Sequence, residues 1–95
     1  MDNYQLRIET KLTNGFAPSR LKVIDQSDLH AHHAGARDGG QTHFKVLMVS
    51  SAFDGVNRVK RQRMVHEALK SELEERVHAL SLTLRTPAEE AKRLD

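Results

Sequence analysis

The sequence predicts an α+β protein, a two-layer sandwich in which helices pack on a three-stranded sheet in the order α-β-β-α-β-α. Two segments place apolar side chains at helical spacing, and three short runs have the apolar content typical of strands. The length of 95 residues fits one domain over residues 1–95. Helices on one face of the sheet are needed to bury its leucine and valine rows.

The first half of the chain predicts one helix and two strands. Near the start, apolar side chains recur every four residues, at Tyr4, Ile8 and Leu12. This spacing predicts a helix that Asp2 or Asn3 caps and that Asn14–Gly15 ends, followed by a strand over 21–25. A second strand is expected over 43–49, and we expect the two strands to form an antiparallel pair.

Between these strands, residues 26–41 show no period and form a loop of unusual length for a compact domain. The second half begins with a predicted long helix over 58–75, capped by Asn57. Its expected buried stripe consists of Val65, Leu69 and Leu73. Alternating leucines predict a third strand over 80–85, and the capping box 86–89 starts a final short helix.

The composition excludes several classes of protein. There is no cysteine, which rules out a disulfide framework and a cysteine-ligated metal site within the chain. A soft or borderline metal ion would need histidine ligands, and any thiolate would have to come from a partner. We find no apolar run long enough to span a membrane and no signal peptide, so we expect a cytoplasmic protein.

Six histidines are unevenly distributed. His30, His32 and His33 lie in the long loop, and this group indicates either a metal or cluster site or a set of solvated side chains. Spacing alone favours solvated side chains. We interpret His43, at the start of the second strand, as structural; His78, just before the third strand, is either an edge histidine or a ligand.

Four cations open the predicted long helix: Arg58, Lys60, Arg61 and Arg63. Cations are unfavourable at a helix N-terminus, where they oppose the helix dipole. The cluster therefore indicates an anionic partner such as nucleic acid, but it is equally typical of a solvated helix face. No phosphate-binding loop, nucleophile elbow or zinc-protease motif is present, so we do not expect an enzyme.

Several of these motifs occur together in an ordered set along the chain. They are Leu21–Ser27, His30–His33, Thr42–Val46, Val49–Ser50, Phe53–Gly55, Val59–Val65, Glu72–Leu73 and Val77–Leu80. The set resembles the BolA family over about residues 4–90. The resemblance implies a class II KH-like (BolA-like) sandwich, which agrees with the element order.

The resemblance also implies a non-enzymatic module that pairs with a monothiol glutaredoxin to bind or traffic a [2Fe-2S] cluster. The glutaredoxin and its glutathione would supply thiolates, and this chain would supply His78 and a loop histidine. His30 matches the family's loop ligand best and His33 is the reserve. No cofactor is expected in the isolated protein, which should be monomeric.

A second activity implied by the resemblance is DNA binding by a transcriptional regulator. Double-stranded DNA would contact the turn and helix at residues 53–66. Two positions depart from the family pattern: Gln62 stands where the family usually has histidine, and His32 where it usually has glycine.

Overall fold

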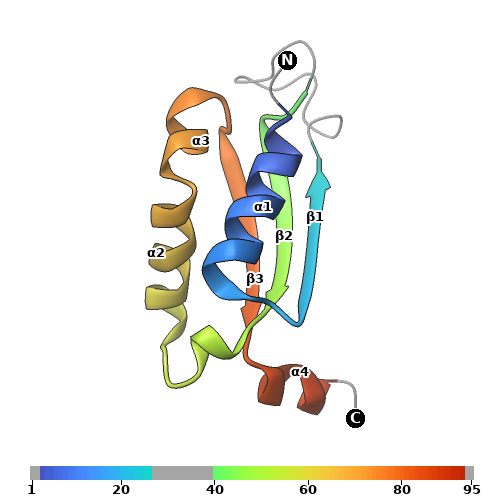
Figure 1. Cartoon of the computed structure of the whole chain (residues 1–95), viewed down its shortest axis with the longest axis vertical. Helices are drawn as coiled ribbons and strands as arrows, with labels where there is room; N and C mark the ends of the chain where they lie inside the picture. Colours follow the sequence, from blue (N-terminus) through green and yellow to red (C-terminus); the bar gives the residue numbers. More distant parts are fainter. Residues whose placement is uncertain (1–2, 27–39, 94–95) are drawn as a thin grey trace.

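The computed structural model describes residues 3–26 and 40–93 (Figure 1). Its helices and strands, in chain order, are α1 (Tyr4–Phe16), β1 (Arg20–Asp25), β2 (His43–Val49), α2 (Arg58–Ala68), α3 (Lys70–Glu75), β3 (Ala79–Arg85) and α4 (Pro87–Arg93). A 3₁₀ turn, Ser51–Phe53, lies between β2 and α2. Every predicted strand and helix is present, and the long helix is divided in two. No helix in the described ranges is long and apolar enough to cross a membrane.

The three strands form one mixed sheet in the order β1-β2-β3. β1 and β2 are antiparallel, as expected, with Val23 opposite Val46. β2 and β3 are parallel, with His43 opposite Ala79. Because β2 and β3 run in the same direction, both begin at the same end of the sheet.

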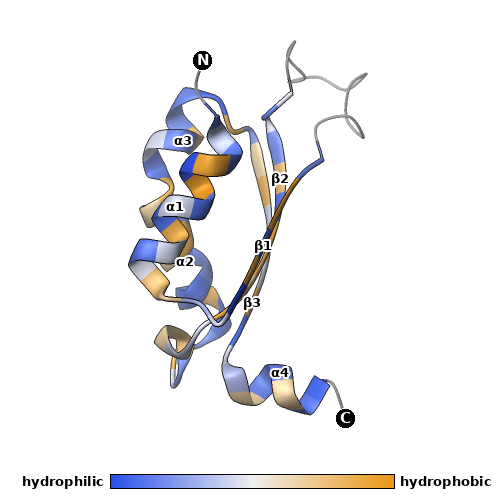
Figure 2. Cartoon of the chain, turned by 45° about the vertical axis from the view of Figure 1, so that its right-hand side comes forward, coloured by the Kyte–Doolittle hydropathy of each residue, from blue (hydrophilic) through white to orange (hydrophobic). Residues whose placement is uncertain are grey.

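Figure 2 shows α1, α2 and α3 on one face of the sheet, with α4 at the end where β3 finishes. Side chains alternate across each strand, so every second residue points toward these helices. The core between the layers is mainly aliphatic, with Phe16 and Phe53 in tilted contact at a centroid distance of 5.4 Å. Its fully buried members include Ile8, Leu12, Val46, Met48, Phe53, Val65 and Leu69.

α1 extends further than the sequence predicts. It ends at Phe16 rather than at Asn14–Gly15, because the Phe16 ring is buried in the core. The hydroxyl of Ser50 donates a hydrogen bond of 2.6 Å to the Phe16 carbonyl, which satisfies an acceptor at the helix end. The left-handed cap is Ala17, with φ 43°, instead of a glycine or asparagine.

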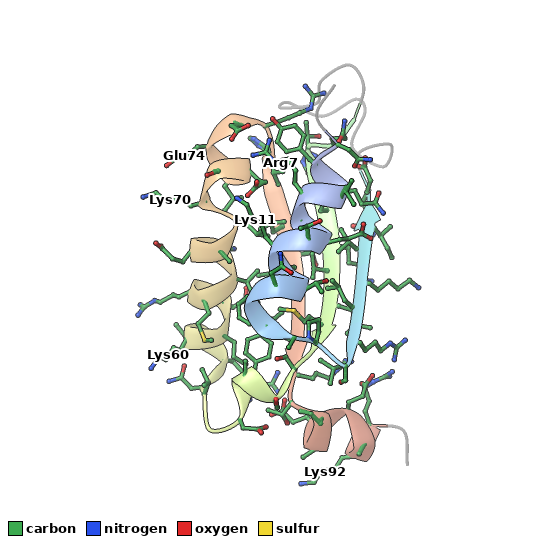
Figure 3. All side chains as sticks on the ribbon, in the orientation of Figure 1. Arg7, Lys11, Lys60, Lys70, Glu74 and Lys92 are labelled. Carbon is green, nitrogen blue, oxygen red and sulfur yellow. The ribbon has the colours of Figure 1, made fainter. Side chains whose placement is uncertain are left out.

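The predicted long helix is interrupted at Leu69, whose φ and ψ of −104° and 19° depart from helical geometry. Leu69 is fully buried, and so is Glu72 in the next turn. The Glu72 carboxylate accepts hydrogen bonds from Lys11 at 2.8 Å and from Arg7 at 2.9 Å, so α3 is tied to α1 (Figure 3). Burial alone would raise the pKa of Glu72, but these hydrogen bonds outweigh it and lower the pKa.

Candidate functional site

Two histidine side chains meet at the end of the sheet where β2 and β3 begin. His43 is the first residue of β2, and His78 immediately precedes β3. Their ring centroids are 5.5 Å apart and the rings are tilted by 51°. His78 is exposed and His43 is half-buried, so this pair of imidazoles lies at the surface.

Thr42 is hydrogen-bonded to both histidines, to the backbone of His78 and to the ring of His43. Its carbonyl accepts hydrogen bonds from the N–H groups of His78, at 2.6 Å, and Ala79, at 3.1 Å. Its hydroxyl is hydrogen-bonded to Nδ1 of His43 at 2.9 Å. Thr42 is itself almost completely buried, so the pair stands on a packed part of the sheet.

The two described residues that flank 27–39, Gln26 and Gly40, are both hydrogen-bonded close to this pair. On one side, the N–H of Gln26 donates to the carbonyl of His43 at 2.8 Å. On the other, the Arg76 guanidinium donates two hydrogen bonds to the Gly40 carbonyl, from Nε at 3.0 Å and from Nη2 at 2.8 Å. Arg76 is only two residues before His78, so one side chain links the returning loop to the connection that positions His78. His30, His32 and His33 lie in the intervening 27–39, outside the described residues.

Gln41 strengthens the same anchor. Gly40 and Gln41 both have left-handed backbones, with φ of 65° and 64°, a conformation that costs a non-glycine residue energy. The side-chain oxygen of Gln41 accepts a hydrogen bond from the backbone N–H of Tyr4 at 2.6 Å. The backbone N–H of Gln41 donates to the Asp25 carboxylate at 3.1 Å. These bonds hold the strained turn against the N-terminus of α1 and the end of β1.

The donor set of this edge is incomplete within the described residues. No group of three or more histidine, cysteine, aspartate or glutamate side chains that could hold a metal occurs in 3–26 and 40–93. Two imidazoles without a thiolate do not make the four-ligand set of a structural zinc site.

The structure adds a neighbour to His43 that the sequence did not indicate. The hydrogen bond to Thr42 fits the structural role expected for His43. Its contact with the His78 ring follows from the parallel pairing of β2 and β3, which places the two strand starts side by side. The strand–helix–strand order is a signal for parallel pairing, since parallel neighbours need such a crossover connection, whereas nothing local indicates the register that brings the two rings together.

A second candidate surface lies on the first turns of α2. Arg58, Lys60 and Arg63 are exposed there, and Lys60 points away from the body of the molecule (Figure 3). They line a shallow open groove together with the apolar side chains of Val59 and Met64. The side chain of Asn57 caps the helix by accepting the N–H of Lys60 at 2.8 Å, as predicted.

Arg61 corrects the expectation that all four cations face a nucleic acid. It is only 6% exposed, and its guanidinium donates two hydrogen bonds to Glu89, at 2.7 and 3.1 Å. It also donates to the carbonyls of Val56, at 2.7 Å, and Leu84, at 3.2 Å. Since these donors are used internally, Arg61 ties α2 to α4 and β3 and is not part of the exposed cationic surface.

The protein family follows from a comparison with family models. The model described as BolA-like protein matches residues 12–89, which is most of the chain. The chain belongs to the BolA family. The BolA family relatives also account for the fold: the BolA domain of SufE1 from Arabidopsis thaliana covers 94% of this chain, with a TM-score of 0.84 and 40% identity. The α+β fold is thereby confirmed, and the class II KH-like label stays a prediction.

Two curated BolA relatives are similar in sequence. BOLA1, chloroplastic, from A. thaliana is 42% identical over 94% of this chain. A Vibrio cholerae protein named DNA-binding transcriptional regulator BolA is 42% identical over 86% of this chain and 74% of its own length. These names describe BolA proteins and a regulator rather than enzymes.

The BolA chain described here is shorter than some of its relatives. It spans 57% of the length of BOLA1 and 24% of the length of SufE-like protein 1, chloroplastic/mitochondrial, from A. thaliana. The names of these two relatives place them in organelles, so the cytoplasmic location expected for this chain stays a prediction.

Proposed function

We propose that this chain is a non-enzymatic BolA-family module that pairs with a monothiol glutaredoxin to bind or traffic a [2Fe-2S] cluster. The cluster is cargo, held between the two proteins. The glutaredoxin and its glutathione supply thiolates, and this chain supplies His78 together with His30 or His33 from the loop.

The observation that carries the proposal is the position of His78. Its imidazole is exposed at a sheet end, beside His43, and the loop with the other candidate ligands is anchored at that same end by Arg76 and Gln26. A cluster seated there would meet imidazoles on one side and a partner's thiolates on the other. The donor set of the described residues fits such a shared site, because imidazole is an established substitute for thiolate on one iron and raises the reduction potential.

The proposal is tested by mixing this protein with a cluster-loaded monothiol glutaredoxin under anaerobic conditions. We expect a heterocomplex whose visible absorption and circular dichroism differ from those of the glutaredoxin alone. His78→Ala should change these spectra, because a ligand is lost, and His30→Ala should weaken the complex. His66→Ala is the matched control, since His66 is an exposed histidine on α2. Spectra that are the same for His78→Ala and the unsubstituted protein would remove His78 as a ligand.

We propose DNA binding as a second candidate function. It is favoured by the exposed cations of α2 and by the name of the V. cholerae relative, a DNA-binding transcriptional regulator. Phosphate contacts release counterions, so duplex affinity should fall steeply with salt. Replacing Arg58, Lys60 and Arg63 together with alanine should reduce the salt slope by about 3 and weaken binding to every sequence. Lys70→Ala is the control; a triple variant that keeps the affinity and the salt slope of the unsubstituted protein would exclude this surface.

A further inference from the structure

Within residues 3–26 and 40–93, no helix packs on the face of the sheet opposite to α1, α2 and α3 (Figure 2). Core residues such as Val23 and Val46 alternate with the residues that point to this face. We define the open sheet face by the six central residues Lys22, Ile24, Lys45, Leu47, Ser81 and Thr83.

The register brings these side chains into one continuous patch. Lys22 lies opposite Leu47, and Ile24 lies opposite Lys45. Lys45 and Leu47 are in turn paired with Ser81 and Thr83. Both lysines are exposed, Ile24 is 37% exposed, and Leu47 is half-buried. The patch therefore has two aliphatic side chains with a cation beside each, and none of its six residues is acidic.

The patch is bounded differently at its two ends. At the end near α4, Glu90 accepts hydrogen bonds from Arg20, at 2.8 Å, and Arg85, at 3.2 Å, so the charges of these arginines are compensated. At the other end, His43 continues the row of Lys45 and Leu47 along β2, and the His78 ring lies next to it. The open sheet face thus runs without a break into the pair of imidazoles.

We infer that the open sheet face is a docking surface for an acidic face of a protein partner; resting on the proposed function, that partner is the cluster-sharing glutaredoxin. The charge of the patch selects the partner, because Lys22 and Lys45 form no ion pair within the described parts of the chain. A carboxylate-bearing surface compensates these charges, while Ile24 and Leu47 provide apolar contact area. The continuity with His43 means that a partner seated here also reaches His78.

Two other occupants fit less well. A second copy of the chain placed face to face would bring lysines against lysines, which is unfavourable. Single-stranded nucleic acid needs aromatic side chains on which bases stack, and the six residues include none.

The test compares charge reversals of equal size on different faces. Lys22→Glu and Lys45→Glu place an acidic residue on the open sheet face, and Lys70→Glu places one on the outer side of α3 (Figure 3). Affinity for a cluster-loaded monothiol glutaredoxin is measured by calorimetry at about 0.05 M and about 0.5 M salt. Thermal unfolding of each variant verifies that it is folded.

We expect each substitution on the open sheet face to weaken binding about tenfold at low salt and much less at high salt. At saturation, the visible spectrum of the complex should equal that of the unsubstituted protein, because no ligand is changed. Lys70→Glu should alter the affinity by less than about twofold.

The inference is overturned if the two reversals bind as the unsubstituted protein does, or if Lys70→Glu weakens binding equally. The inference is also overturned if Lys22→Glu and Lys45→Glu abolish self-association of the chain, or its binding to a duplex, and leave glutaredoxin binding intact. A failure of the proposed function gives a different result, because the unsubstituted protein would then form no complex with the glutaredoxin. That result would also exclude the glutaredoxin as the partner of the open sheet face.

Discussion

Arg61 and Arg63 are two residues apart on α2, yet the fold gives them opposite environments. Two positions are about 200° around a helix, so one side chain points to the sheet when the other points to solvent. Arg61 is 6% exposed and bonded to Glu89, while Arg63 is exposed. The sequence indicated a cationic helix start, but the apolar stripe of α2 is too weak to say which cation faces inward.

This difference predicts unequal costs of substitution. Arg61→Ala removes the guanidinium donors from the Leu84 and Val56 carbonyls and from Glu89, and we expect the free energy of unfolding to fall by about 2–3 kcal/mol. Arg63→Ala should change it by less than about 0.5 kcal/mol. Urea denaturation of the two variants measures both values. Equal stability of the two variants would show that Arg61 is not a structural residue.

Glu72 is a residue that sequence analysis could not place. It stands among acidic residues that are typical of a solvated helix end, but it is fully buried and bonded to Arg7 and Lys11. These partners are 65 and 61 residues away in the chain. No local pattern indicates a contact over such a separation, because it depends on how α1 and α3 pack.

At the scale of elements, the sequence predicts a helix start correctly where a side chain near that start caps the helix. Asn57 caps α2 as predicted, and Thr86 and Glu89 form the expected capping box, with hydrogen bonds of 2.9 and 3.1 Å. The break at Leu69 was missed because no glycine or proline marks it; tertiary packing of Leu69 interrupts the helix. The parallel pairing of β2 and β3 has a signal in the order strand, helix, strand, but no local pattern indicates the register that places His43 beside His78.

The attachment of α4 and α3 to the rest of the fold through the carboxylates of Glu89 and Glu75 should depend on pH. The hydrogen bonds from Arg61 and from the Thr86 N–H lower the pKa of Glu89 to about 2, from an ordinary value of 4.5. Arg7 likewise lowers the pKa of Glu75 to about 2. Because these folded-state pKa values are the lower ones, the unfolded state binds protons first as pH falls. The stabilisation is therefore complete above about pH 4.5 to 5 and is lost as pH falls toward 2.

Unfolding free energies measured between these pH values test this dependence. Glu89→Gln removes one of the carboxylates whose pKa is lowered by folding, so stability should fall less steeply with decreasing pH than in the unsubstituted protein. Glu67→Gln, at an exposed position of α2, should leave the slope unchanged. A slope that is the same for Glu89→Gln and the unsubstituted protein would contradict the assignment to Glu89.

For the molecule as a whole, the direction of the elements separates the two candidate surfaces. β2 and β3 begin at one end of the long axis, where His43 and His78 meet, and α2 begins at the opposite end (Figure 1). The described chain extends 39 Å along its longest axis. A duplex on the first turns of α2 and a glutaredoxin at the histidine edge therefore contact different parts of the protein.

This separation predicts that the two activities are independent. The triple alanine substitution of Arg58, Lys60 and Arg63 should weaken duplex binding and leave the spectrum of the glutaredoxin complex unchanged. His78→Ala should change that spectrum and leave duplex binding unchanged. In fluorescence anisotropy with a labelled duplex, adding cluster-loaded glutaredoxin should raise the signal further, because a ternary complex is larger than the binary one. Displacement of the duplex by glutaredoxin would mean that both partners compete for one surface, which is incompatible with sites at opposite ends of the fold.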